Sequence, residues 1–258
     1  MSNPRAPILE WPGPGPGIID PITLYRKRPR IPPRVVLCFF KEVLDEAAAA
    51  GELIKSESLR GEGDPLPVYV AGRGRGAIAV ARPGISAPFA AAALEELIGL
   101  GGRAFLCCGG AGVLDGTIPV GTPIVVTKAL RDEGTSYHYS RPSRWARPDR
   151  ALTLLLAKVC KEAGVPFLRG ASWTTDAVFR ETPSQIRRRR AEGCLTVEME
   201  AAALFAVARF RGIPFGQILY AGDDVSGPRW ENRGWMYQAA ARRRLLDLTL
   251  EAARKIPA

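Results

Sequence analysis

Two carboxylates separated by one residue form the first segment that could do chemistry. Glu198 and Glu200 flank Met199 within residues 196–204, where an expected strand meets an apolar, alanine-rich helix. Residues two apart in an extended chain face the same side, so either carboxylate could accept hydrogen bonds from a pair of vicinal hydroxyls beside an apolar methionine. A carboxylate at a helix N-terminus is also stabilised by the helix dipole, so a purely structural role stays open.

A second acidic pair, Asp223 and Asp224, follows the apolar residues 219–221. When adjacent carboxyls are partly desolvated, repulsion between their charges favours the protonated form of one of them. That group can then donate a proton near neutral pH. The alternative is a turn in which the aspartates cap the next segment.

A glycine-rich segment, residues 107–112, follows the apolar run 104–108. In a turn, the backbone N–H groups of Gly109 and Gly110 could approach an anion or a sugar closely. The segment has neither the lysine of a P-loop nor the glycine spacing of a dinucleotide-binding fold, and a tight strand exit is the alternative.

Residues 172–182 contain Trp173, Phe179 and Arg180. Aromatic rings stack on heterocycles and a guanidinium hydrogen-bonds their carbonyl groups, so this segment could bind a base. The same residues could equally belong to the core and the surface.

The composition excludes several other classes of protein. The 258 residues are 47% hydrophobic and 24% charged, as in soluble globular proteins. No apolar stretch approaches the roughly 20 residues of a membrane span, and the N-terminus lacks a secretory signal, so we expect a cytoplasmic protein without membrane partners. Five cysteines without a CxxC pair and a single histidine, His138, argue against disulfides and metal centres.

The net charge of +10 invites a nucleic-acid interpretation. The arginine runs at 187–190 and 242–244 are instead expected to lie on solvated helix faces, because like-charge runs usually do. A basic nucleic-acid-binding module is kept as the weaker alternative.

Alternating strand and helix patterns predict an α/β fold with a central mixed, mostly parallel sheet. The expected strands are residues 35–40, 68–71, 77–81, 104–108, 123–127, 167–172 and 217–221. The expected helices are residues 41–50, 87–100, 149–163, 200–211 and 235–255. Residues 1–34 repeat proline and glycine, which predicts an extended arm before a single folded domain at 35–258. This arm could reach a neighbouring subunit or remain disordered.

Taken in order, four segments resemble the nucleoside phosphorylase-I superfamily, which includes purine nucleoside phosphorylases, uridine phosphorylases and related nucleosidases. The segments are residues 82–88 with 94–98, 108–114 with 118–121, 197–203 and 222–225. The most specific of them is Glu-Met-Glu before an alanine-rich helix.

The resemblance implies a single-domain, three-layer α/β/α enzyme that cleaves the N-glycosidic bond of a purine or pyrimidine nucleoside. It also implies a homo-oligomer, as a dimer, trimer or hexamer, and no cofactor beyond inorganic phosphate as co-substrate. By the resemblance, Glu200 and Met199 bind the ribose, with Glu198 as a further candidate, and Asp224 protonates the departing base, with Asp223 as the alternative acid.

At the base, the resemblance implies stacking by Phe179 or Trp173 and recognition of a carbonyl by Arg180, with Gly109 beside them. His138, which lies in Tyr-His-Tyr after an expected strand, is a candidate to line the same cleft.

Most of the residues that contact phosphate in these relatives are replaced by other residue types in this sequence. Residues 38–42 stand where an early Gly-Asp-Pro-x-Arg loop is usual, Cys107 stands at an arginine position and Gly110 at a hydroxyl position. Lys41, Arg82 or an arginine of a partner chain could hold the anion instead. A phosphorylase is therefore expected, while a nucleosidase that uses water and a catalytically silent nucleoside-binding protein remain alternatives.

Overall fold

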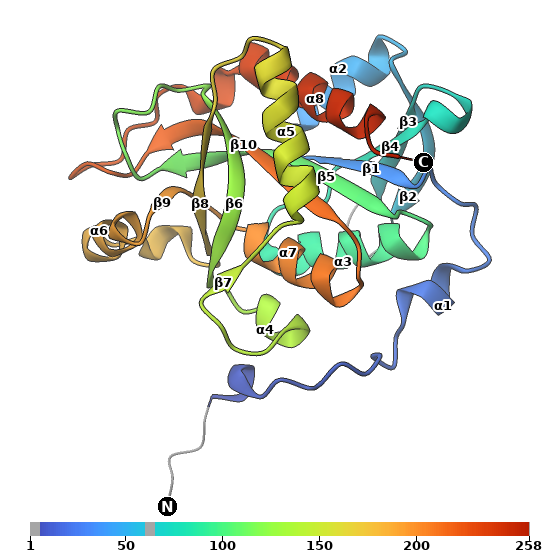
Figure 1. Ribbon diagram of the computed structural model, residues 1–258, viewed down its shortest axis with the longest axis horizontal. Coiled ribbons are helices and arrows are strands. Elements are labelled where there is room, and N and C mark those ends of the chain that lie inside the picture. The colour runs from blue at the N-terminus through green and yellow to red at the C-terminus, as the bar shows by residue number, and fades with distance from the viewer. Residues whose placement is uncertain (1–5, 60–64, 258) are drawn as a thin grey trace, which may run out of the picture.

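A mixed sheet of ten strands lies at the centre of the molecule (Figure 1). The computed structural model describes residues 6–59 and 65–257. The strands are β1 (Arg34–Cys38), β2 (Leu53–Leu59), β3 (Leu66–Ala71), β4 (Ile78–Ala81), β5 (Ala104–Val113), β6 (Pro123–Asp132), β7 (Trp145–Ala146), β8 (Leu168–Thr175), β9 (Cys194–Glu198) and β10 (Phe215–Asp224).

Helices connect most of these strands. The α-helices are α1 (Pro21–Tyr25), α2 (Lys41–Ala49), α3 (Ala87–Gly99), α4 (Ser136–Tyr139), α5 (Arg150–Glu162), α6 (Pro183–Ala191), α7 (Ala201–Phe210) and α8 (Ala239–Arg254). Short 3₁₀ turns are η1 (Pro7–Leu9), η2 (Gly74–Gly76), η3 (Val178–Arg180) and η4 (Trp235–Tyr237). None of the helices within the described residues is long and apolar enough to cross a membrane.

Helices cover both faces of the sheet, which confirms the expected three-layer α/β/α architecture. Figure 1 shows α2 and α8 above the sheet and α3 and α7 below it. Strand β1 illustrates the layering. Val35 and Leu37 belong to the core on the side of the sheet that α3 and α7 cover. Val36 and Cys38 belong to the core on the other side, which α2, α5 and α8 cover. A strand that is buried on both faces appears in the sequence as one continuous apolar run.

Strand β5 is the hub of the sheet. It pairs in parallel with β1 and β10 and antiparallel with β9. The order β5, β10, β6, β8, β9 closes back on β5 as a ring, while β1, β4, β3 and β2 extend from it as an open sheet. The sheet is mixed, as expected, and its longest ladders, β5–β10 and β6–β8, are parallel.

The glycine-rich segment is not a turn, which corrects the expectation from the sequence. Gly109 and Gly110 lie inside β5 and pair with Leu219 and Tyr220 of β10. A Cβ atom on Gly110 would lie 2.9 Å from Cε1 of Tyr220, too close for a real contact. Glycine is therefore needed there because the Tyr220 ring packs directly on the strand.

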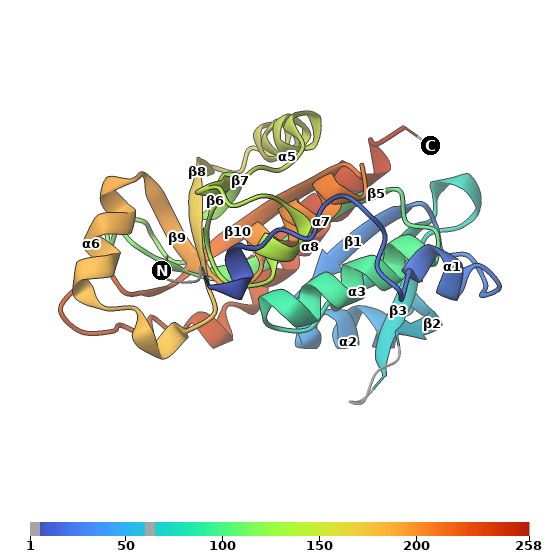
Figure 2. The same ribbon diagram turned by 90° about the horizontal axis from the view of Figure 1, so that it is seen from below.

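The N-terminal arm packs on its own chain in the described residues. Helix α1 lies against α3, where a Cβ on Gly99 would meet the Pro21 carbonyl oxygen at 2.5 Å. Arg211, which follows α7, bridges Asp20 of the arm and Glu95 of α3, at 3.3 and 2.7 Å. Figure 1 shows the arm running from α1 past α4, and Figure 2 shows α1 beside one end of α3. The division into an arm and a domain at residue 34 stays a prediction.

The arginine runs are only partly solvated. Arg189, in α6, is buried, donates to Asp132 at 2.7 Å and lies over the Trp173 ring. Arg242, in α8, is also buried, where it pairs with Glu42 and donates to the Tyr220 hydroxyl at 3.1 Å. The expectation of a fully exposed basic face is therefore wrong at these two positions.

Candidate active site

The predicted site residues gather where several strands end. Strands β4, β1, β5 and β10 are parallel neighbours, so their carboxyl ends meet at one edge of the sheet. Arg82 follows β4, while Asp223 and Asp224 end β10. In α/β folds, ligands bind at this edge.

Glu200 is a buried carboxylate at the start of α7. Its Oε1 accepts a hydrogen bond of 2.7 Å from the Ser86 backbone N–H, and its Oε2 accepts one of 3.3 Å from the N–H of Met199. Burial first, and the Glu198 charge second, raise the pKa of Glu200 to about 8. At neutral pH this group is mainly a carboxylic acid, which both donates and accepts hydrogen bonds. Met199 beside it is half-buried.

Glu198 faces the interior with both of its oxygens engaged. Its Oε1 accepts from the hydroxyls of Ser172 and Thr174, at 3.0 and 2.7 Å. Its Oε2 accepts from the backbone N–H groups of Glu200 and Ala201, at 2.7 and 2.6 Å. This corrects the expectation that Glu198 offers its oxygens to a sugar: it satisfies free N–H groups at the start of α7 and thereby positions Glu200.

Asp223 lies where β5, β9 and β10 meet. A Cβ on Gly112 would be 3.5 Å from both Asp223 carboxylate oxygens and 3.2 Å from Cγ1 of Val197, two residues before Met199. Oδ2 of Asp223 accepts a hydrogen bond of 2.7 Å from the Trp230 indole N–H. The β5–β10 register shifts between Ala221 and Asp224, and such irregularities commonly re-aim side chains at sites.

Asp224 serves the turn that follows β10. Its Oδ1 accepts from the Ser226 N–H at 2.7 Å, and its backbone exchanges hydrogen bonds with Glu231. Its Oδ2 lies 2.6 Å from where a Cβ on Gly116 would stand. The two neighbouring aspartates thus have different surroundings, and Asp224 has the contacts of a turn-capping residue.

The aromatic candidates for base binding also differ from one another in their surroundings. Phe179 and Arg180 are exposed on η3, and Phe179 keeps 97% of its accessible surface. Trp173 is only 1% exposed, and its indole N–H donates to Asp132 at 2.9 Å. This corrects the expectation for Trp173, because its ring packs in the core on the opposite face of β8 from Ser172 and Thr174.

Aromatic rings pack against the two glycines of β5 that were expected near the ligands. Gly109, which the resemblance places at the base, faces Phe39, whose Cδ2 would lie 3.1 Å from an added Cβ, and Gly110, a phosphate candidate, faces Tyr220 in the same way. Lys41 is exposed and pairs with Asp45 of its own helix. Arg82 is half-buried at the end of β4. His138 is exposed on α4, a four-residue helix.

Two contributors were not singled out from the sequence. The Ser86 N–H reaches Glu200 because Ser86 adopts a positive φ of 106°, a conformation that no sequence pattern announces. Glu181 follows η3 within the segment that holds Phe179, and it is half-buried. Burial, followed by the charge of Asp223, raises the pKa of Glu181 to about 7. A lone glutamate in a loop gives no periodic signal, so only the tertiary fold identifies it.

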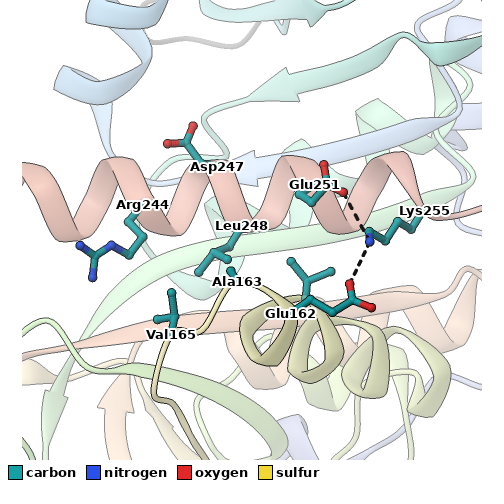
Figure 3. Close-up of a pocket in the computed structure, with 9 residues that line it drawn as sticks. Glu162, Ala163, Val165, Arg244, Asp247, Leu248, Glu251 and Lys255 are labelled. Atoms are coloured by element: carbon teal, nitrogen blue, oxygen red, sulfur yellow. Dashed lines mark hydrogen bonds and ion pairs between the residues drawn. The ribbon is translucent and has the colours of Figure 1, made fainter.

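No group of three or more His, Cys, Asp or Glu side chains in residues 6–59 and 65–257 could hold a metal ion. A groove of about 410 Å³ lies apart from the predicted site residues, between α5 and α8 (Figure 3). Lys255 bridges Glu162 and Glu251 across it, at 2.9 and 3.5 Å. The groove contains none of the predicted site residues.

Comparison with known proteins gives a consistent result. The family model described as the phosphorylase superfamily matches residues 33–251. A guanosine phosphorylase of Halorubrum lacusprofundi is 33% identical over 141 residues, which is 55% of this chain and 58% of the relative. A uridine phosphorylase of Thermococcus kodakarensis is 30% identical over 157 residues, which is 55% of this chain and 56% of the relative. The chain thus matches little more than half the length of these two relatives.

A crystal structure of uridine phosphorylase from Vibrio fischeri has a similar fold. Its TM-score is 0.74, and the alignment covers 90% of this chain and 94% of that one at 24% identity. The likeness confirms the fold class that the sequence predicted.

Proposed function

Because this chain belongs to the phosphorylase superfamily, we propose that it is a nucleoside phosphorylase. It would cleave the N-glycosidic bond of a purine or pyrimidine nucleoside with inorganic phosphate, giving a free base and a sugar 1-phosphate. The observation that carries the proposal is the buried Glu200 carboxyl held by the Ser86 and Met199 N–H groups at the strand edge that also carries Asp223.

The proposed chemistry uses the two ends of the site differently. We define the sugar end by Glu198, Met199 and Glu200, and the base end by Phe179 and Asp223. As the C1′–N bond breaks, its electron pair passes to the base while a phosphate oxygen forms the new bond to C1′. A carboxyl at the base end supplies a proton to the departing base, and Glu200 binds the hydroxyls of the increasingly cationic sugar.

The remaining assignments are proposals of the same kind. Phe179 stacks on the base, Arg180 reads a carbonyl and His138 lines the cleft from α4. Asp223 is preferred over Asp224 at the base because its carboxylate lies beside Gly112 and Val197, whereas that of Asp224 caps a turn. The two relatives are named for guanosine and uridine, so nucleosides of both base classes are candidate substrates.

The nucleophile end, defined by Gly109, Gly110 and Arg82, supports a second candidate function. Rings of Phe39 and Tyr220 lie against the glycines, and Lys41 is paired with Asp45. If Arg82 or a partner-chain arginine does not hold phosphate, water replaces it as the nucleophile and the enzyme is a nucleosidase. Phosphorolysis is preferred because the two relatives described above are named as phosphorylases and because an arginine such as Arg82 can bind a phosphate dianion.

We propose a homo-oligomer that works in the cytoplasm, with a small-molecule substrate and no cofactor other than phosphate. Sedimentation of the purified chain and fractionation of cells test the oligomer and the location.

Release of free base from a panel of purine and pyrimidine nucleosides tests the proposed activity. We expect release from at least one nucleoside. The nucleic-acid alternative predicts instead no release, and a binding affinity for oligonucleotides that falls steeply as salt rises. That pair of results would overturn the proposal.

A further inference from the structure

Trp230 is an aromatic residue at the base end to which neither the sequence nor the resemblance gives a role. It lies in the loop that follows β10 and keeps 59% of its accessible surface. Its indole N–H nevertheless donates a hydrogen bond of 2.7 Å to Oδ2 of Asp223. Because the ring contributes little to the core, its contact with the candidate acid indicates a role in the site.

The loop that carries Trp230 is closed by a backbone bridge. Asp224 and Glu231 exchange two hydrogen bonds, at 2.9 and 3.0 Å, and form an antiparallel pair. In this register Asp223 stands opposite Asn232, and Trp230 is the diagonal neighbour of Asp223 on the same face. Aromatic side chains span such a diagonal. The hydrogen bond between Trp230 and Asp223 therefore follows from the way the loop closes.

The segment that follows the loop is also held to the body of the molecule. Arg233 donates a hydrogen bond of 2.7 Å to the carbonyl oxygen of Ile118. The Trp235 carbonyl accepts one of 2.8 Å from the Tyr220 hydroxyl. A Cβ on Gly222 would lie 3.4 Å from Cβ of Trp235, so this segment packs directly on β10. The loop is thus anchored on both of its sides.

The chemistry of the indole decides which oxygen of Asp223 is left for a ligand. An indole N–H can only donate, so Oδ2 is the acceptor in this pair. A proton that the carboxyl gives to a base must therefore come from Oδ1, to which no hydrogen bond is found within residues 6–59 and 65–257. The same bond opposes rotation of the carboxyl group, which would exchange its two oxygens.

We propose, resting on the nucleoside-cleaving function above, that Trp230 is a positioning residue for Asp223. It holds Oδ2, so that Oδ1 faces the base and donates the proton. As the C1′–N bond breaks, its electron pair passes to the base. The Oδ1–H bond then breaks while a new N–H or O–H bond forms on the base. The carboxylate regains a proton from water after the base leaves, and Trp230 keeps its own proton throughout.

Trp230→Phe removes the donor and keeps an aromatic ring, so it tests the hydrogen bond alone. On guanosine or inosine we expect kcat to fall about tenfold while KM changes less than about twofold, because the bond acts on proton transfer. The N7-methylated nucleoside carries a positive base that departs without a proton, so its kcat should fall less than about twofold. If the chain accepts only pyrimidines, uridine should lose more than 5-fluorouridine, whose base takes up the electron pair more readily.

Trp11→Phe is the matched control. The Trp11 indole N–H is buried and has no hydrogen-bond partner in the part of the chain that the structure describes. The same substitution there should change neither rate. Circular dichroism and melting temperature report whether each variant is folded.

A double-mutant cycle shows whether Trp230 acts through Asp223. Adding Trp230→Phe to Asp223→Ala should lower kcat by less than a further factor of about two, since no carboxyl is left to position. Nuclear magnetic resonance reports the hydrogen bond without any activity. Of the five tryptophan indole N–H signals, the one that Trp230→Phe removes should move further in Asp223→Ala than the others do.

Several results would overturn the proposal. Equal losses on both leaving groups in Trp230→Phe would show a structural role, and no loss on either would show no role. A full loss on the Asp223→Ala background, or an indole signal that stays in place there, would separate Trp230 from Asp223. If the wild-type chain releases no base from any nucleoside, the proposed function fails and this role fails with it. The other results leave base release intact, so the two failures are distinguishable.

Discussion

At the sugar end, Glu198 accepts four hydrogen bonds from β8 and the start of α7, while at the nucleophile end the rings of Phe39 and Tyr220 lie against the glycines of β5. In the first region, both oxygens of Glu198 accept hydrogen bonds, and this holds in place the polar groups that are proposed to bind a sugar. In the second region, aromatic rings occupy the space where cations that bind phosphate were expected. The comparison teaches that two ends of one candidate site can be built by different means, with hydrogen-bonded polar groups at the sugar end and packed aromatic rings at the nucleophile end.

The largest predicted effect concerns the sugar end, where a substitution should lower the free energy of unfolding. Glu198→Ala removes the acceptor for two hydroxyls and two backbone N–H groups. Donors left buried without partners cost about 1–3 kcal/mol each, so for these four donors we expect a loss of at least about 4 kcal/mol in the free energy of unfolding. Urea denaturation measures it, and Glu198→Gln, which keeps one acceptor oxygen, should restore part of the loss. An unchanged midpoint would contradict the positioning role of Glu198.

The next effect is on catalysis. Glu200→Ala should lower kcat/KM about 100-fold on a ribonucleoside, because it removes the hydrogen bonds to the sugar hydroxyls. The loss should be smaller on the 2′-deoxynucleoside, which lacks one hydroxyl. Steady-state kinetics with both substrates measure the difference. Equal losses on the two substrates would separate Glu200 from recognition of the hydroxyls.

Arg82→Met tests whether Arg82 binds phosphate at the nucleophile end. We expect KM for phosphate to rise about tenfold while KM for the nucleoside stays unchanged, since one charge-assisted contact to the anion is lost. Lys41→Met is the matched control, because Lys41 is exposed and already pairs with Asp45. A larger effect at Lys41 than at Arg82 would exchange their roles.

The last effect is a dependence of stability on pH. Burial raises the pKa of Glu200 in the folded chain to about 8, above its unfolded value of 4.5. The folded state therefore holds this proton more tightly, and its contribution to stability falls as pH rises from about 4.5 to about 8. Glu200→Gln, which does not ionise, should melt about 8–16 °C above wild type at pH 8 and close to it at pH 4.5, because a pKa raised from 4.5 to about 8 corresponds to about 4 kcal/mol over this range. Melting curves at the two pH values measure this, and a constant difference would contradict it.

The sequence predicted the elements whose pattern is local. The apolar runs of β1 and β10, and the helices that end before Gly164 and Gly212, appear close to their expected places. The candidates Glu200, Met199 and Asp223 could also be selected from the sequence, because paired carboxylates at strand ends are visible in one short stretch, and the structure has them at the ends of β9 and β10. Their roles in the site stay proposals.

Features that depend on distant contacts could not be predicted. The continuation of β5 through Gly109 and Gly110 depends on rings supplied by Phe39 and Tyr220. The ring of strands closes through pairs far apart in the chain, and the burial of Trp173 follows from that closure. Glu181 stands out only in the folded chain, which half-buries its side chain.

The identity of the nucleophile tests the central claim most directly. The purified chain is incubated with guanosine and with uridine in ¹⁸O-labelled water, with and without inorganic phosphate, and the sugar product is identified by mass spectrometry. The account predicts base release that requires phosphate, with an unlabelled sugar 1-phosphate as the product. Phosphate-independent release of ribose carrying ¹⁸O would contradict it and make the enzyme a nucleosidase.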